Sequence, residues 1–92
     1  MEDKQLYIIQ VKGRVQGVGF KWSAANEARA LNITGFVRNL SDGSVYLEAE
    51  GRRSDIDAFV EWCKTGPAFG YVEDIEVVKG EIKNYKEFSI LR

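Results

Sequence analysis

The hydrophobic and polar positions along the chain predict several short strands interrupted by two helices. Stretches rich in β-branched and large apolar residues predict three early strands, at 6–11, 33–40 and 44–50. The last of these alternates apolar with polar side chains, in the order Val45, Tyr46, Leu47, Glu48, Ala49 and Glu50. Because successive side chains of a strand point to opposite faces, this alternation predicts a sheet with one buried and one wetter face.

Two other segments have the periodicity of amphipathic helices. In 20–31, strong helix formers place apolar side chains on one face, at Phe20, Ala24, Ala28 and Leu31. The second helix is expected to begin with an N-cap at Ser54, and its apolar positions are Ile56, Phe59, Val60 and Cys63. Gly66 and Pro67 are expected to end it.

The remaining segments complete an α+β pattern. We expect a hairpin turn at 41–43, a break at Gly51, a fourth strand at 71–78, and a short fifth strand that contains Phe88 and Ile90. The order β-α-β-β-α-β predicts a ferredoxin-like split β-α-β fold, in which two helices cover one face of an antiparallel sheet. A chain of 92 residues makes one domain, 1–92.

The loop between the first strand and the first helix carries the clearest chemical signal. It reads Gly13-Arg14-Val15-Gln16-Gly17-Val18-Gly19-Phe20-Lys21. Glycines allow backbone angles at which successive N–H groups converge on one oxyanion, and the start of a helix adds its positive end. Lys21 would supply a full charge. The P-loop pattern fails because Val18 stands where its second glycine is required, and the dinucleotide pattern fails at Trp22.

Composition narrows the function classes further. Thirteen Lys and Arg stand against 14 Asp and Glu, so there is no basic excess to hold a nucleic acid. Cys63 is the only cysteine and there is no histidine, which excludes an intrachain disulfide and argues against a zinc site. We expect Cys63 in the core, no cofactor and no metal. The charged first residues lead into a short apolar run, without the long apolar segment of a signal peptide or membrane span, so we expect a cytoplasmic protein that does not bind a membrane. We also expect a monomer.

Two motifs resemble those of the acylphosphatase family. The glycine loop is similar to the phosphate loop of that family. The segment Gly35-Phe36-Val37-Arg38-Asn39-Leu40-Ser41-Asp42-Gly43-Ser44-Val45 is similar to its second motif, at the spacing found in the family. The resemblance covers nearly all of the chain, and the element order derived above agrees with the family fold.

The resemblance implies metal-free hydrolysis of the carboxyl–phosphate bond in small acyl phosphates, with water as the attacking group. Backbone N–H groups would hold the phosphoryl oxygens, a role that falls to Gln16, Gly17, Val18, Gly19 and Phe20. Lys21 would neutralise these oxygens, and the Asn39 amide would orient the water. Since an acyl phosphate carries a good leaving group, positioning and charge stabilisation can suffice without a histidine, a thiol or a metal.

One position departs from the family pattern. The family has an arginine where this chain has Lys21, and a lysine lacks the planar fork that binds two phosphate oxygens at once. We therefore expect reduced efficiency. Arg14 matches a further arginine of the family, and Arg38 should point to the sheet face opposite Asn39, so neither is expected to substitute. The alternative is a non-catalytic phosphate- or anion-binding module on the same fold.

Overall fold

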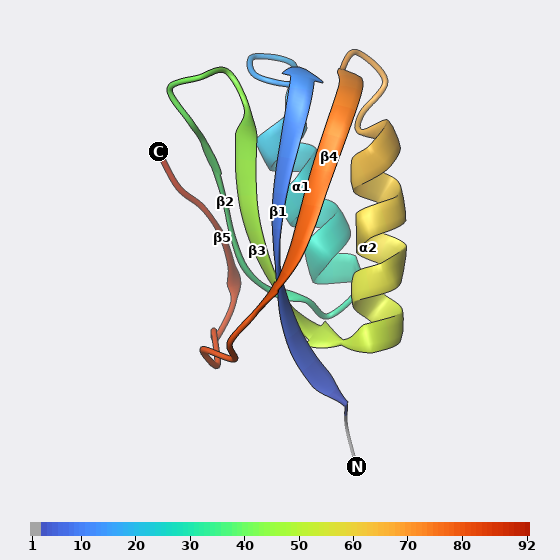
Figure 1. Ribbon diagram of the computed structural model, residues 1–92, viewed down its shortest axis with the longest axis vertical. Coiled ribbons are helices and arrows are strands. Elements are labelled where there is room, and N and C mark those ends of the chain that lie inside the picture. Colours follow the sequence, from blue (N-terminus) through green and yellow to red (C-terminus); the bar gives the residue numbers. More distant parts are fainter. Residues whose placement is uncertain (1–2) are drawn as a thin grey trace.

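The computed structural model describes residues 3–92, in which two helices lie on one face of a five-stranded sheet (Figure 1). The elements in chain order are β1 (Lys4–Arg14), α1 (Phe20–Ala30), β2 (Thr34–Asn39), β3 (Val45–Arg52), α2 (Arg53–Thr65), β4 (Tyr71–Gly80) and β5 (Phe88–Ile90). The predicted ferredoxin-like α+β fold is confirmed.

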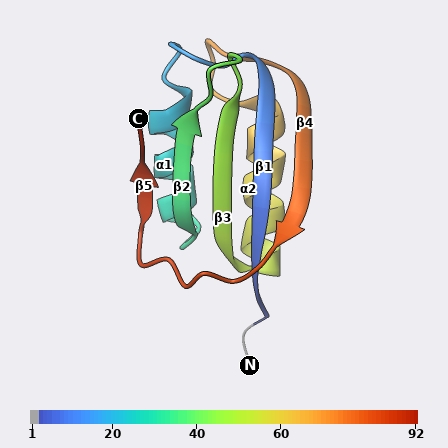
Figure 2. The same cartoon turned by 60° about the vertical axis from the view of Figure 1, so that its left-hand side comes forward.

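The sheet has the strand order β4-β1-β3-β2-β5, seen face on in Figure 2. Its first four strands pair antiparallel, but β5 pairs parallel with β2, so the expectation of a wholly antiparallel sheet is wrong. The reason is the connection at 81–87. It crosses from β4 at one edge of the sheet to the opposite edge, at the end where β2 begins, and β5 then runs in the direction of β2.

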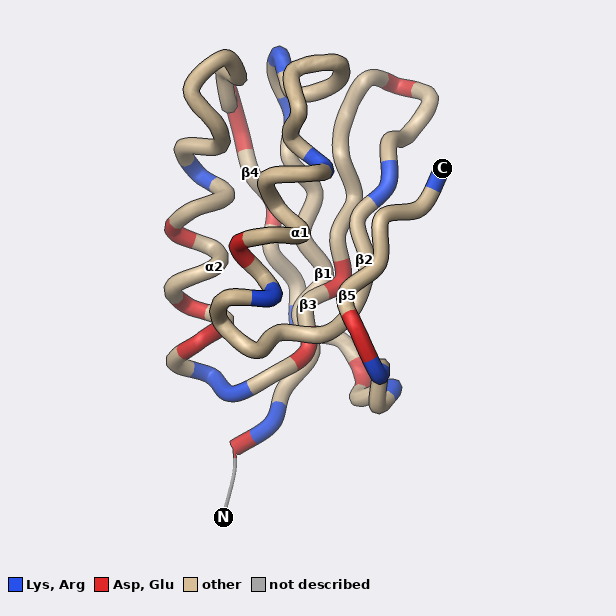
Figure 3. Tube along the Cα trace, turned by 180° about the vertical axis from the view of Figure 1, so that it is seen from behind, with Lys and Arg blue, Asp and Glu red and all other residues tan. Residues whose placement is uncertain are grey.

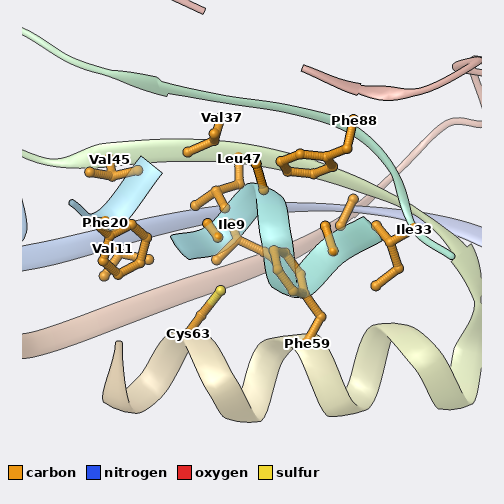
Figure 4. Packing of buried hydrophobic residues seen from close by; sticks show 14 of the residues in the cluster. Ile9, Val11, Phe20, Ile33, Val37, Val45, Leu47, Phe59, Cys63 and Phe88 are labelled. Atoms are coloured by element: carbon orange, nitrogen blue, oxygen red, sulfur yellow. The ribbon is translucent and has the colours of Figure 1, made fainter. Parts of the chain in front are cut away.

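The core lies between the sheet and the two helices (Figure 4). Ile9 and Leu47 from the sheet meet Phe59 and Cys63 from α2, and all four are fully buried. The ring of Phe59 also lies edge to face against Phe88, with 6.0 Å between centroids. The prediction that Cys63 belongs to the core is confirmed, and burial raises the pKa of its thiol.

Two predicted boundaries around the second helix are wrong. Gly51 does not break the third strand, which continues to Arg52 because the pairing with β1 extends to the partners Gln5↔Gly51 and Lys4↔Arg52. The helix therefore begins at Arg53 rather than after an N-cap at Ser54. Its predicted end is confirmed, since Gly66 follows the last helical residue with a φ of 71°.

The expectation of a wetter sheet face is wrong at β3. Glu48 and Glu50 are 4% and 0% exposed. The segment 81–87 crosses this end of the face on its way to β5, and its backbone and side chains contact both carboxylates (Figure 2). A strand pattern predicts which residues share a face, but it does not reveal a later segment that covers them.

Candidate active site

Three strands bring the candidate residues to one end of the sheet. β1, β2 and β5 run in the same direction, so the loop after β1, Asn39 at the end of β2 and Ile90 at the end of β5 share that end (Figure 2). Lys21 joins them because α1 begins directly after the loop. The two motifs singled out in the sequence therefore meet in the fold.

The loop at 15–19 has the backbone of an anion cradle. Gly17 and Gly19 have φ angles of 75° and 79°, in the left-handed region that favours glycine, and Gly19 is the N-cap of α1. A Cβ at either glycine would meet nothing within 4 Å, so conformation rather than crowding requires glycine there. Within residues 3–92, no protein acceptor binds the N–H groups of 16–19. These donors, with the first turn of α1, are available to an anion.

Gly13 does not belong to this cradle. It lies at a register shift between β1 and β4, where a Cβ would stand 2.2 Å from the carbonyl oxygen of Tyr71. Glycine is needed at this position because β1 and β4 approach each other too closely for a side chain. The sequence grouped Gly13 with the loop glycines because spacing alone does not distinguish a bulge from a ligand loop.

Both ends of the loop are anchored in the core. Val15 and Phe20 are each 1% exposed, and the Phe20 ring lies 5.4 Å from that of Trp62. Val18 is partly buried against the same core. The side chain of Phe20 therefore packs the interior, and only its backbone N–H is left for the binding role predicted from the sequence.

The side chain of Gln16 ties the loop to the β2–β3 turn. Its Nε2 donates to the carbonyl oxygens of Leu40 and Ser44, both at 2.8 Å. The loop is thus fixed beside the end of β2, where Asn39 lies. Sequence reasoning gave Gln16 a backbone role and missed this tether, because no local pattern reveals which distant carbonyl a side chain reaches.

A pocket of about 330 Å³ opens between these parts. Its lining includes Gly17, Gly19, Lys21, Trp22, Asn39 and Ile90, and the buried Val15 and Phe20 complete it. A somewhat larger hollow, of about 410 Å³, lies beside Lys4, Asn32 and Asp55. We place the site in the smaller pocket, because there the unpaired loop donors, a cation and an amide converge.

Asn39 and Lys21 differ in their hydrogen bonding. Lys21 Nζ donates to the carbonyl oxygen of Leu91 at 3.3 Å. Asn39 Oδ1 is buried and has no hydrogen-bond partner in the part of the chain that the structure describes. Arg38 is exposed and stands opposite Tyr46 on the other face of the sheet, as predicted, so it does not join the site.

Charged residues of both signs are spread along the described chain. Figure 3 shows Lys and Arg interspersed with Asp and Glu along the trace, including the outer turns of α2. Some form local ion pairs on that helix, such as Lys64 with Glu61 at 2.8 Å. In residues 3–92, no helix is long and apolar enough to cross a membrane.

Comparison with known proteins places the chain in a family. The acylphosphatase family model matches residues 7–90, and the chain belongs to the acylphosphatase family. The acylphosphatase of Archaeoglobus fulgidus is 45% identical over 82 residues, which cover 89% of this chain and 92% of that protein.

Two solved structures agree in fold. An acylphosphatase from Coxiella burnetii superposes with a TM-score of 0.93 at 34% identity, covering 96% of this chain and 93% of the other. The Bacillus subtilis acylphosphatase gives a TM-score of 0.92 at 40% identity, covering 95% and 98%. Membership at this similarity makes the chain a hydrolase of the class that acts on acyl phosphates.

Proposed function

We propose that this chain hydrolyses small acyl phosphates by direct attack of water, with the roles divided between the loop and Asn39. The N–H groups of 16–20 bind the phosphoryl oxygens, and Lys21 neutralises their charge. Asn39 orients the attacking water. Family membership supports the reaction class, and the unpaired donors of the loop support the first of these roles.

The reaction needs little from the protein beyond position and charge. The water oxygen forms a bond to phosphorus as the bond from phosphorus to the carboxyl oxygen breaks, and the carboxylate leaves with that electron pair. One proton of the water passes to a phosphoryl oxygen of the substrate, and the other stays on the oxygen that is now bound to phosphorus. Because the leaving group is already stable, holding the reactants in line and stabilising the phosphoryl charge supply most of the rate.

The unpartnered Asn39 Oδ1 carries this proposal. A buried acceptor without a partner costs about 1–3 kcal/mol, so a polar atom of this kind in a pocket wall favours a partner from the ligand side. A water that donates one O–H to Oδ1 keeps a lone pair free for phosphorus. The tether from Gln16 supports the assignment, because it fixes the end of β2 against the loop that holds the phosphate.

With Lys21, hydrolysis at the proposed site is slower than it would be with an arginine at this position. An ammonium is a point charge, whereas a guanidinium binds two phosphoryl oxygens with fixed geometry. Losing one contact directed at the transition state costs roughly two to three orders of magnitude in rate. The contact of Nζ with Leu91 also draws the cation towards the C-terminal segment. This contact favours the second candidate, a phosphate-binding module without turnover.

Asn39→Ala separates the two roles. We expect kcat with acetyl phosphate to fall by at least about a hundredfold, while the Kd of inorganic phosphate stays within about twofold, because the loop and Lys21 are intact. Asn26→Ala is the matched control, since Asn26 is exposed on α1. Phosphate affinity that falls as far as the rate would contradict the division of roles. A wild-type protein that binds phosphate without hydrolysing acetyl phosphate would establish the binding module instead.

A further inference from the structure

The side chains around the pocket divide into a polar and an apolar group. Lys21 and Asn39 are polar and belong, with the loop donors, to the phosphoryl end of the proposed substrate. Trp22 and Ile90 also line the pocket, and they are 67% and 42% exposed. Trp22 belongs to α1 and Ile90 to β5, so the two side chains are far apart in the sequence and the fold brings them to the same pocket.

The exposure of Trp22 has no explanation in the packing of the domain. The other tryptophan, Trp62, packs against the aromatic residues of the core. Its ring centroid lies 5.4 Å from that of Phe20 and 6.2 Å from that of Phe59. Trp22 forms no ring pair within residues 3–92. Single exposed apolar residues are common, but an indole and an aliphatic side chain that line the same pocket as a cation and an amide are typical of a ligand-contacting wall.

We propose, on the basis of the function proposed above, that Trp22 and Ile90 form an acyl-side subsite that selects aromatic acyl groups. With the phosphoryl group held by the loop, the acyl group extends to the part of the pocket where these two side chains lie. An indole face stacks on a flat ring and gains little from a methyl group. Lys21 is the one cation among the described residues that line the pocket, and the phosphoryl group engages it, so a charged acyl group finds no partner.

Two measurements on Trp22→Ala test the subsite. The first is kcat/KM with benzoyl phosphate and with acetyl phosphate. The second is calorimetric binding of benzoylphosphonate, a non-hydrolysable aromatic analogue, and of inorganic phosphate. Each value is compared with wild type for the same compound, which removes the difference in intrinsic reactivity. Tyr71→Ala is the matched control, because Tyr71 is 63% exposed on β4, at the opposite edge of the sheet from β5.

We expect Trp22→Ala to lower kcat/KM with benzoyl phosphate and affinity for benzoylphosphonate by about tenfold, the scale of one aromatic contact. Values with acetyl phosphate and inorganic phosphate should stay within twofold. Trp22→Phe should restore most of the loss, and Tyr71→Ala should change none of the four values.

Equal losses with the aromatic and the small compounds would overturn the subsite, and so would no loss at all. A protein that hydrolyses neither acyl phosphate overturns the proposed function instead. In that case the ratio of benzoylphosphonate to phosphate affinity still decides the subsite.

Discussion

Two segments of this chain present successive backbone N–H groups, and they differ in whether the chain itself supplies an acceptor. In the connection between β4 and β5, Glu50 accepts from the N–H groups of Lys83 and Asn84 at 2.7 and 2.9 Å, and from that of Tyr85 at 2.7 Å. In the loop before α1, the N–H groups of 16–19 bind no acceptor of the described chain. One cradle is filled by the protein's own carboxylate, and the other has no acceptor within residues 3–92.

The filled cradle stabilises the fold. Asn84 has a φ of 59°, which turns the segment around the buried carboxylate. Burial by itself would raise the pKa of Glu50, but the three backbone hydrogen bonds outweigh it and hold the pKa below the ordinary value. Converging N–H donors favour a negatively charged acceptor, and in this segment Glu50 supplies it, which makes the segment a structural clamp.

A second carboxylate strengthens the clamp through side chains. Glu48 accepts from the hydroxyls of Tyr46 and Tyr85, at 2.7 and 2.5 Å, and from Lys83 Nζ at 3.0 Å. Burial opposes the charged form, but these hydrogen bonds and the Lys83 charge keep the pKa of Glu48 below its usual value. Burial and the neighbouring Glu48 raise the pKa of Tyr46 to about 12. The clamp also fixes the start of β5, whose last residue, Ile90, lines the pocket.

Of the substitutions in the two cradles, Glu50→Gln should have the largest effect, and this effect is on the stability of the fold. The amide replaces one acceptor oxygen by a donor that faces backbone N–H groups, so we expect the free energy of unfolding to fall by about 2–4 kcal/mol. Denaturant unfolding at neutral pH measures it. Glu61→Gln is the control, because its side chain is 72% exposed and pairs with the exposed Lys64, and its loss should stay below about 1 kcal/mol. A Glu50→Gln loss as small as that of Glu61→Gln would mean that the clamp contributes nothing.

The same variant should change the acid response. The pKa of Glu50 is lower in the folded protein than in the unfolded chain. The charged carboxylate therefore stabilises the fold fully above its unfolded pKa, and this stabilisation is lost as the pH falls through its folded pKa. Below about pH 4.3, stability should therefore fall less steeply in Glu50→Gln, by up to about 1.4 kcal/mol per pH unit. Parallel pH curves for the two proteins would contradict the low pKa.

Lys21→Arg tests the open cradle and has the next largest expected effect. In the proposed site a guanidinium would donate two parallel hydrogen bonds to the phosphoryl oxygens, so we expect kcat/KM to rise by at least about tenfold, a little over 1 kcal/mol. Acetyl phosphate hydrolysis measures the change, and Lys64→Arg on the exposed side of α2 is the control.

The other outcomes for Lys21→Arg are equally informative. Turnover that stays at background while phosphate affinity holds would establish the binding module, because charge alone is enough to hold the anion. A wild type that is already fast and is slowed by arginine would show that the loop is adapted to lysine, and the argument from fork geometry would then be wrong.

How much the sequence could predict also differs between the two cradles. The glycine loop could be singled out from the sequence, because its glycines, a helix start and a cation are contiguous in the chain, and its anion-binding role stays a prediction. The filled cradle was not predicted, because Glu50 and 83–85 are far apart in sequence and the alternation at β3 indicated an exposed carboxylate. The apolar pocket residue Ile90 was missed for a related reason, since its position depends on the parallel pairing Val37↔Ile90.

The smallest expected effect concerns the coupling between the two cradles. Inorganic phosphate at ten times its Kd should stabilise the wild type by about 1.4 kcal/mol, because it binds only the folded chain. The two cradles share no side chain, and effects at independent sites add within roughly 0.5 kcal/mol, so Glu50→Gln should gain nearly the same increment. Thermal unfolding with and without phosphate measures both increments. Lys21→Met should gain almost no stability from phosphate, because its cation is gone.

A lost increment in Glu50→Gln would mean that the clamp positions the pocket through β5, whose next residue, Leu91, accepts a hydrogen bond from Lys21. The filled cradle would then contribute to ligand binding as well as to folding.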